Sequence, residues 1–225
     1  MKSMTEEHFA ILRRHMVEVI AIHADLSSEQ IGKDTISPRV IAAMRKVPRH
    51  LFVPEPLALY AYHDMPLPIG FEKTISQPFI VAVMTDLLDP QPHEAVLEVG
   101  TGLGYQASIL AQLARQVWTV EVVEELATEA EARLLAQDIA NVEIRIGDGS
   151  RGWVEHAPFD KIMVTAGAEL IPPALIQQLK PGGRMVLPTG LPDDQKLTVV
   201  DKDKAGRTRL RELMPVRFSK LETVL

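Results

Sequence analysis

Three glycines and one acidic residue form the clearest chemical pattern in this sequence. Gly100, Gly102 and Gly104 come directly after an apolar stretch that predicts a strand, where a helix must begin. Glycines allow backbone N–H groups to approach a ligand that a Cβ atom would block. Glu121 follows Gly102 by 19 residues, close to the spacing of about 20 at which an acid meets ribose hydroxyls. Residues 96–122 therefore predict the adenosine-binding half of a doubly wound α/β domain.

The spacing of the glycines indicates which adenosine compound binds. A dinucleotide site has the pattern G-x-G-x-x-G, but Tyr105 stands where its third glycine would fall. The run G-x-G-x-G favours S-adenosylmethionine, which has no pyrophosphate, over NAD. Considered alone, the run is also compatible with an ordinary tight turn in another α/β protein. Thr101, Tyr105 and Val122 complete the expected contacts of the cofactor with the first two strand ends.

Further polar groups are predicted within or after other strands of the same sheet. Asp148 and Gly149 follow the third predicted strand, and Thr165 follows the fourth. Because the carboxyl ends of parallel strands share one edge, we expect these residues beside the glycines. Asp148 either accepts a hydrogen bond from the adenine amino group or caps the next turn. Glu98, inside the first strand, either supports the methionine ammonium group or belongs to a core or surface network.

Ser76 is the remaining candidate for chemistry. It lies in the segment 74–78, where Pro78 and the apolar residues after it predict a helix that Ser76 caps. A nucleophilic role is disfavoured because no G-x-S-x-G pattern surrounds it and no spacing identifies a partner histidine. None of the seven histidines forms an H-x-x-x-H pair, and the chain has no cysteine. We therefore expect no metal, no disulfide and no thiolate chemistry.

The composition restricts the class of protein. The 225 residues suffice for one large domain, or for a domain with a helical extension. The net charge of −6 argues against a broad nucleic-acid surface. No apolar run approaches the roughly 20 residues that span a bilayer. Charges interrupt residues 1–26 too often for a signal peptide, so we expect a cytoplasmic protein without membrane partners.

The periodicity predicts an α/β fold with a doubly wound, mostly parallel sheet, an N-terminal helical extension and an antiparallel C-terminal hairpin. We place the extension at residues 1–92 and the Rossmann-like, cofactor-binding domain at 93–225, within one compact unit. Residues 49–70 are expected to be ordered loop. Predicted helices begin near residue 9 and at 38, 78, 124 and 172, and predicted strands cover residues 142–146, 161–165, 184–187, 196–201 and 210–218.

Six motifs together resemble one enzyme family. They are VPRHLFVP at 47–54, PLPIG at 66–70, TISQP at 74–78, VLEVGTGLGYQ at 96–106, GDG at 147–149 and LKPGGRMVLPTG at 179–190. The combination strongly resembles protein-L-isoaspartate O-methyltransferases. The glycine run and PGG occur in many S-adenosylmethionine enzymes, whereas VPRHLFVP and TISQP are specific to this family.

The resemblance implies a function and a site. The family transfers a methyl group from S-adenosylmethionine to the free α-carboxyl of L-isoaspartyl residues in damaged proteins, and the ester then closes to a succinimide. The serine of the TISQP-like motif, regarded as the active-site residue, corresponds to Ser76. Thr74, Ile75 and Gln77 would then lie along the substrate groove.

The chain departs from the family pattern at two places near the expected site. The family usually continues from V-R-F into V-P-L, whereas Phe218 is followed here by Ser219, Lys220 and Leu221. The turn 167–169 also differs from the alanine- and proline-rich sequence of the family. Two alternatives therefore stay open: a methyltransferase with another, small-molecule acceptor, and a cofactor-binding protein without turnover.

Overall fold

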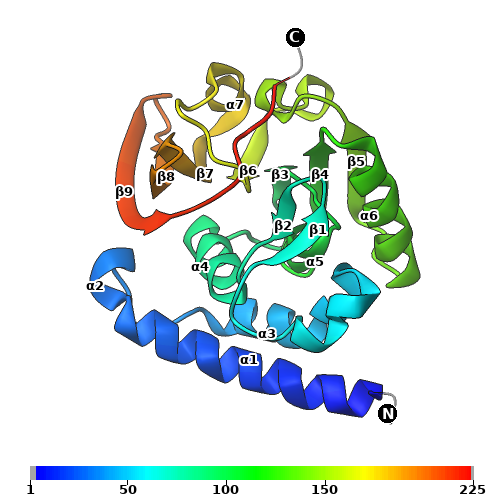
Figure 1. The fold of residues 1–225 in the computed structure, drawn as a ribbon. Coiled ribbons are helices and arrows are strands. Elements are labelled where there is room, and N and C mark those ends of the chain that lie inside the picture. Colours follow the sequence, from blue (N-terminus) through cyan, green and yellow to red (C-terminus); the bar gives the residue numbers. More distant parts are fainter. Residues whose placement is uncertain (1–3, 224–225) are drawn as a thin grey trace.

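A seven-stranded sheet forms the centre of the computed structural model, which describes residues 4–223 (Figure 1). Five neighbouring strands of this sheet are parallel, and the last two strands of the chain continue the sheet antiparallel. This confirms the predicted mostly parallel sheet with a C-terminal hairpin. In spatial order the strands are β5 (Val142–Ile146), β4 (Gln116–Glu121), β3 (Ala95–Val99), β6 (Phe159–Val164), β7 (Leu179–Leu191), β8 (Asp194–Lys202) and β9 (Thr208–Val216).

Helices cover both faces of this sheet. Successive side chains of a strand point to opposite faces, so Val96 and Leu97 of β3 belong to two separate apolar clusters. The Val96 cluster includes residues of the first six helices, and the Leu97 cluster includes residues of the last. The helices are α1 (Glu6–Leu26), α2 (Ser28–Ile31), α3 (Pro38–Lys46), α4 (Pro78–Leu88), α5 (Tyr105–Ala111), α6 (Glu124–Ala136) and α7 (Pro173–Gln178).

The N-terminal helices share one apolar core with the central sheet. Helix α1 is amphipathic, as predicted, and buries Met16 and Ile20 in the same cluster as Val96. The Ser37 side chain caps α3 by accepting a hydrogen bond from the Arg39 N–H. Figure 1 shows α1 lying along the edge formed by α3 and α4. The boundary at residue 92 stays a prediction.

Residues 49–70 contain more regular structure than the sequence indicated. Two 3-10 helices, η1 (Arg49–Phe52) and η2 (Glu55–Tyr60), precede strand β1 (Leu67–Gly70). Strand β1 pairs with β2 (Lys73–Ile75) in a separate two-stranded sheet. Prolines interrupt longer elements here, but short turns and an edge hairpin tolerate them. The second strand of this hairpin contains Thr74 and Ile75, so the hairpin overlaps the start of the TISQP segment. Two further 3-10 helices are η3 (Gly149–Arg151) and η4 (Val154–His156).

Two local predictions were wrong. Ser76 does not cap α4, because the helix begins at Pro78 and its N-cap residue is Gln77. The carboxylate of Asp64 instead accepts a hydrogen bond from the Phe79 N–H, at 2.8 Å. Strand β7 also starts at Leu179 instead of residue 184, because Leu179 pairs with Phe159 across the expected stop signal. Gly183 permits this pairing, since a Cβ there would lie 2.7 Å from the Asp160 carbonyl oxygen.

Within residues 4–223, no helix has both the length and the apolar character needed to cross a bilayer.

Candidate active site

One large cavity, of about 750 Å³, opens at the carboxyl ends of the parallel strands. Its wall includes Gly100 after β3, Glu121 at the end of β4 and Thr165 after β6. Strands β3 and β6 are neighbours whose chains continue to opposite sides of the sheet, which is the switch point where α/β proteins bind ligands. Ser76 and the segment after β9 line the same cavity. The site thus combines the sheet edge with two distant parts of the chain.

Glycines allow neighbouring segments of the cavity wall to pack closely together. Gly100 has a φ of +97°, and a Cβ there would lie 2.4 Å from Thr165 Oγ1. The Thr165 hydroxyl donates to the Gly100 carbonyl oxygen at 2.7 Å, which fixes the two strand ends together. Gly149 packs equally closely, because a Cβ would lie 2.3 Å from Val99 Cγ1. A side chain at either position would therefore overlap protein atoms that are already there.

Glu121 organises the turn and retains capacity for a ligand. It is 5% exposed. Its carboxylate accepts hydrogen bonds from the backbone N–H groups of Gly102 (2.8 Å), Val122 (2.9 Å) and Val123 (3.1 Å). A carboxylate offers about four acceptor sites. Three backbone donors therefore leave room for one further donor from the cavity, such as a ribose hydroxyl.

Glu98 lies in the core and does not line the cavity. It accepts a 2.5 Å hydrogen bond from the Thr119 hydroxyl, and Thr119 in turn contacts Thr101 at 2.7 Å. Burial raises the pKa of Glu98 to about 8; the Thr119 hydrogen bond opposes this shift and the charge of Glu121 adds to it. Of the two roles considered for Glu98, its contacts therefore match the one in a core hydrogen-bond network. With a pKa of about 8, Glu98 is protonated at neutral pH.

This raised pKa predicts a pH-dependent stability. Between pH 4.5, the ordinary value, and about 8, the unfolded chain loses the Glu98 proton while the folded chain keeps it. The contribution of Glu98 to the free energy of unfolding is therefore full below pH 4.5 and lost as the pH rises through about 8. Glu98→Gln removes this dependence. We expect its stability relative to wild type to increase by on the order of a few kcal/mol between pH 5 and pH 8. Urea unfolding at the two pH values measures this, and an unchanged difference would contradict it.

Ser76 is held from behind by a buried arginine. The guanidinium of Arg49 is fully buried. Its Nη2 donates to the Ser76 carbonyl oxygen and its Nε donates to the Ala61 carbonyl oxygen, both at 2.7 Å. The guanidinium carbon also lies 4.8 Å from the centre of the Tyr105 ring. Burial lowers the pKa of Arg49 to about 10. Arg49 thus links the VPRHLFVP motif to the TISQP motif and to the helix after the glycine run.

A second support holds Gln77. Asp64 accepts a hydrogen bond from Gln77 Nε2 at 2.8 Å and contacts His23 Nδ1 at 2.5 Å. Both Gln77 and His23 line the cavity, while the Asp64 side chain is 6% exposed. The His23 ring packs edge-on against Phe79. Helix α1 therefore contributes a cavity residue that the sequence pattern did not reveal.

The comparisons with known proteins agree with this geometry. Residues 23–223 match the family described as protein-L-isoaspartate(D-aspartate) O-methyltransferase (PCMT). The chain is 56% identical over 220 residues to protein-L-isoaspartate O-methyltransferase 1 of Polaromonas sp. strain JS666, covering 98% of this chain and 93% of that protein. The chain belongs to the PCMT family. A second relative, from Syntrophobacter fumaroxidans, is 53% identical and covers 95% of this chain and 87% of its own length.

Solved structures of PCMT proteins share the fold. One protein-L-isoaspartate O-methyltransferase has a TM-score of 0.78 and 25% identity, and the alignment covers 92% of this chain and 65% of that one. A putative member from Plasmodium falciparum, solved in complex with S-adenosyl-L-homocysteine, has a TM-score of 0.73 and 23% identity. That alignment covers 84% of this chain and 92% of the other.

The structure brings most of the sequence-predicted PCMT residues to the cavity. Those that line it are Gly100, Gly102, Glu121, Val122, Gly149, Thr165, Thr74, Ser76 and Gln77. The others do not line it, namely Glu98, Thr101, Gly104, Tyr105, Ile75 and Asp148. Of these, Thr101, Tyr105 and Ile75 line a small pocket of about 50 Å³ that shares wall residues with the large cavity. Asp148 accepts hydrogen bonds from the backbone N–H and the hydroxyl of Ser150. It therefore caps η3, which agrees with the second of its two predicted roles, a cap of the next turn. Whether each residue contacts the cofactor or the peptide stays a prediction.

Sequence-based prediction did not identify the cationic side chains that line the cavity or the buried charged residues that hold its wall in place. Lys73, Arg217 and Lys220 line it, and none of them was a candidate. Arg49 and Asp64 support it from behind. The VPRHLFVP motif contained a signal for Arg49, because an arginine between apolar residues must find buried acceptors. The long-range contacts of His23 and Asp64 gave no local signal.

Proposed function

We propose that this cavity transfers a methyl group from S-adenosylmethionine to the free α-carboxyl of an L-isoaspartyl residue in damaged proteins and peptides. One observation supports this most strongly: a single cavity joins the glycine turn and Glu121 to the TISQP segment. The first pair is typical of an adenosine site. The second carries the motif that distinguishes the family. Membership of the PCMT family gives the reaction and the cofactor.

The residues present fit the cofactor. Glu121 has one acceptor site left for a ribose hydroxyl, and Gly100 and Gly149 line the same cavity without side chains. We assign Val122 and Thr165 to the same wall. When bound, S-adenosylmethionine supplies an electrophilic methyl group on a sulfonium sulfur. Glu98, buried behind Thr119, supports the strand on which this site is built and is not assigned a direct contact.

The substrate side requires alignment rather than a base. A carboxylate with a reference pKa near 4 is already ionised at neutral pH, so no side chain has to remove a proton. The chain must hold the carboxylate oxygen in line with the methyl group and exclude water. We assign the Ser76 hydroxyl to donate a hydrogen bond to that carboxylate. This hydroxyl does not cap α4 and has no hydrogen-bond partner among residues 4–223, so it is available to a substrate. Thr74 and Gln77 flank the peptide.

The methyl ester makes the following repair step spontaneous. Esterification replaces a poor leaving group on the α-carbonyl by methoxide, so the neighbouring backbone nitrogen closes a succinimide and releases methanol. Hydrolysis of the succinimide returns part of the chains to normal aspartate. The isoaspartyl protein is thus the partner we assign, and the cytoplasm is the compartment we expect for it.

A pair of peptides tests this function. The purified protein, given S-adenosylmethionine labelled in its methyl group, should esterify an isoaspartyl peptide and leave the matching aspartyl peptide unlabelled. Equal labelling of both peptides would refute the assignment. Labelling of neither, with turnover on a small molecule, would favour another acceptor.

Ser76→Ala tests the assigned hydroxyl in the same assay. We expect kcat on the isoaspartyl peptide to fall about tenfold, the worth of one hydrogen bond of about 1.4 kcal/mol. The affinity for S-adenosylhomocysteine, measured by calorimetry, should stay at the wild-type value. A defect mainly in that affinity would show that Ser76 serves the cofactor instead.

A further inference from the structure

The segment 217–222, here called the C-terminal strap, crosses the carboxyl ends of the strands after β9 (Figure 1). Its backbone is fixed at Gly167, whose N–H donates to the Ser219 carbonyl oxygen and whose carbonyl accepts from the Leu221 N–H, both at 2.8 Å. The Gln195 side chain holds Phe218 by two further hydrogen bonds, at 2.7 and 3.1 Å. These hydrogen bonds fix the strap in place as one wall of the cavity.

The strap gives the cavity a cationic rim. Arg217 and Lys220 both line the cavity and are both exposed. Neither forms an ion pair with any residue between 4 and 223. Lys73 lines the same rim and is paired with Glu222 of the strap. Lys73, Arg217 and Lys220, together with Glu222, therefore contribute charged side chains to the cavity wall of a chain whose overall charge is −6.

We do not assign these exposed cations to the carboxylate that reacts. Methyl transfer takes place where water is excluded, against the floor formed by Gly100, Val99 and Gly149. Val99 and Gly149 are buried, and so is the one acid of the floor, Glu121. Arg217 and Lys220 are exposed at the opening, where the rest of the peptide chain must enter. Unpaired cations at an entrance attract anionic ligands and select among them.

We propose, on the basis of the function assigned above, that Arg217 and Lys220 bind a second carboxylate on the substrate, carried by a residue next to the isoaspartyl residue. The class of substrate preferred by this chain is then the isoaspartyl peptide with an acidic neighbour. The strap is also where the sequence departs from the usual V-R-F-V-P-L pattern, and Lys220 stands in the divergent part. Arg217 belongs to the shared V-R-F part, so any preference particular to this chain rests on Lys220.

Two peptide series test the proposal. One series carries Glu, Gln or Lys directly before the isoaspartyl residue, and the other carries them directly after it. In at least one series we expect kcat/KM to be about fivefold higher for Glu than for Gln, as for an exposed ion pair. The advantage should shrink when the ionic strength is raised from about 0.01 M to about 1 M, because the Debye length falls from about 30 Å to about 3 Å.

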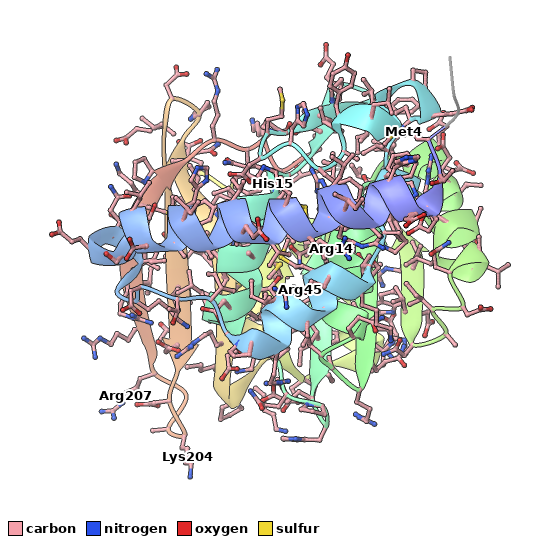
Figure 2. All side chains as sticks on the ribbon, turned by 90° about the horizontal axis from the view of Figure 1, so that it is seen from below. Met4, Arg14, His15, Arg45, Lys204 and Arg207 are labelled. Atoms are coloured by element: carbon pink, nitrogen blue, oxygen red, sulfur yellow. The ribbon has the colours of Figure 1, made fainter. Side chains whose placement is uncertain are left out.

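Variants of the strap identify the cations responsible. In the double variant Arg217→Gln and Lys220→Gln, the Glu to Gln ratio should fall to about one, while kcat/KM for the Gln peptide stays near wild type. Lys204→Gln is the matched control, because Lys204 is an exposed cation at the turn between β8 and β9 (Figure 2). It should retain the wild-type ratio.

Three outcomes would overturn the proposal. Equal rates on Glu and Gln peptides in both series would show that no second carboxylate is recognised. A uniform loss on all peptides in the double variant would place the two cations on the reacting carboxylate. Failure of the wild-type protein to methylate any isoaspartyl peptide would instead refute the proposed function, and the inference with it.

Discussion

Replacing Arg49 by methionine should lower kcat/KM on an isoaspartyl peptide by about 100-fold or more, while the protein still folds. The guanidinium holds the carbonyl of Ser76, and a displacement of about 1 Å in a positioning group can cost about 100-fold in rate. The effect should appear in kcat, since Arg49 lines neither the cofactor wall nor the rim of the cavity.

The stability of this variant should change little, because two large effects oppose each other. Loss of the side chain leaves the carbonyl oxygens of Ala61 and Ser76 without a donor, at a cost of about 1–3 kcal/mol each. Burial of the charge, which lowers its pKa from 12.5 to about 10, itself costs on the order of 3 kcal/mol. The two effects have similar size and opposite sign, so we expect them largely to cancel.

Arg49→Lys is the matched control. Lysine keeps the charge but cannot reach both carbonyl oxygens with a rigid fork, so we expect intermediate activity. Assays of peptide turnover, thermal unfolding and binding of S-adenosylhomocysteine separate the two roles. Wild-type turnover in the methionine variant would contradict a positioning role. If the methionine variant does not fold, the lysine variant must still show a loss in kcat without a loss in cofactor affinity.

Replacing Glu121 by alanine should weaken the binding of S-adenosylhomocysteine by about 100-fold. A hydrogen bond to a charged group contributes about 1.5–3 kcal/mol. The variant loses the one assigned to ribose, and it also frees the N–H of Gly102, so the glycine turn is less well ordered for the ligand. Isothermal titration calorimetry measures the change.

Glu125→Ala provides the control for this experiment. Glu125 lies four residues further on, in the first turn of α6, is exposed and does not line the cavity. Its removal changes the net charge equally and should leave the affinity unchanged. Similar affinities of the Glu121 variant and wild type would show that the adenosine group binds elsewhere.

The glycine turn and Glu121 could be predicted because their signals are local. A strand, a turn that requires positive φ at Gly100 and an acid at the next strand end lie within 27 residues of sequence. The sheet followed from the alternation of apolar segments with helices. These features depend on backbone conformation and periodicity, which neighbouring residues determine.

The errors arise where a distant contact decides the structure. Ser76 has the right type and position for a cap, but Asp64 reaches the start of α4 from an earlier loop and supplies the acceptor. The PGG segment continues β7 because β6 offers it partners. The C-terminal strap lines the cavity through its bonds to Gly167 and Gln195. No local pattern contains these pairings.

A crystal structure of the protein with S-adenosylhomocysteine tests the central claim most directly. We expect the ribose to contact the Glu121 carboxylate, and the sulfur to lie between Gly100 and the Ser76 hydroxyl, facing the rim formed by the C-terminal strap. Density for the ligand outside this cavity, or a sulfur directed away from Ser76, would contradict the account.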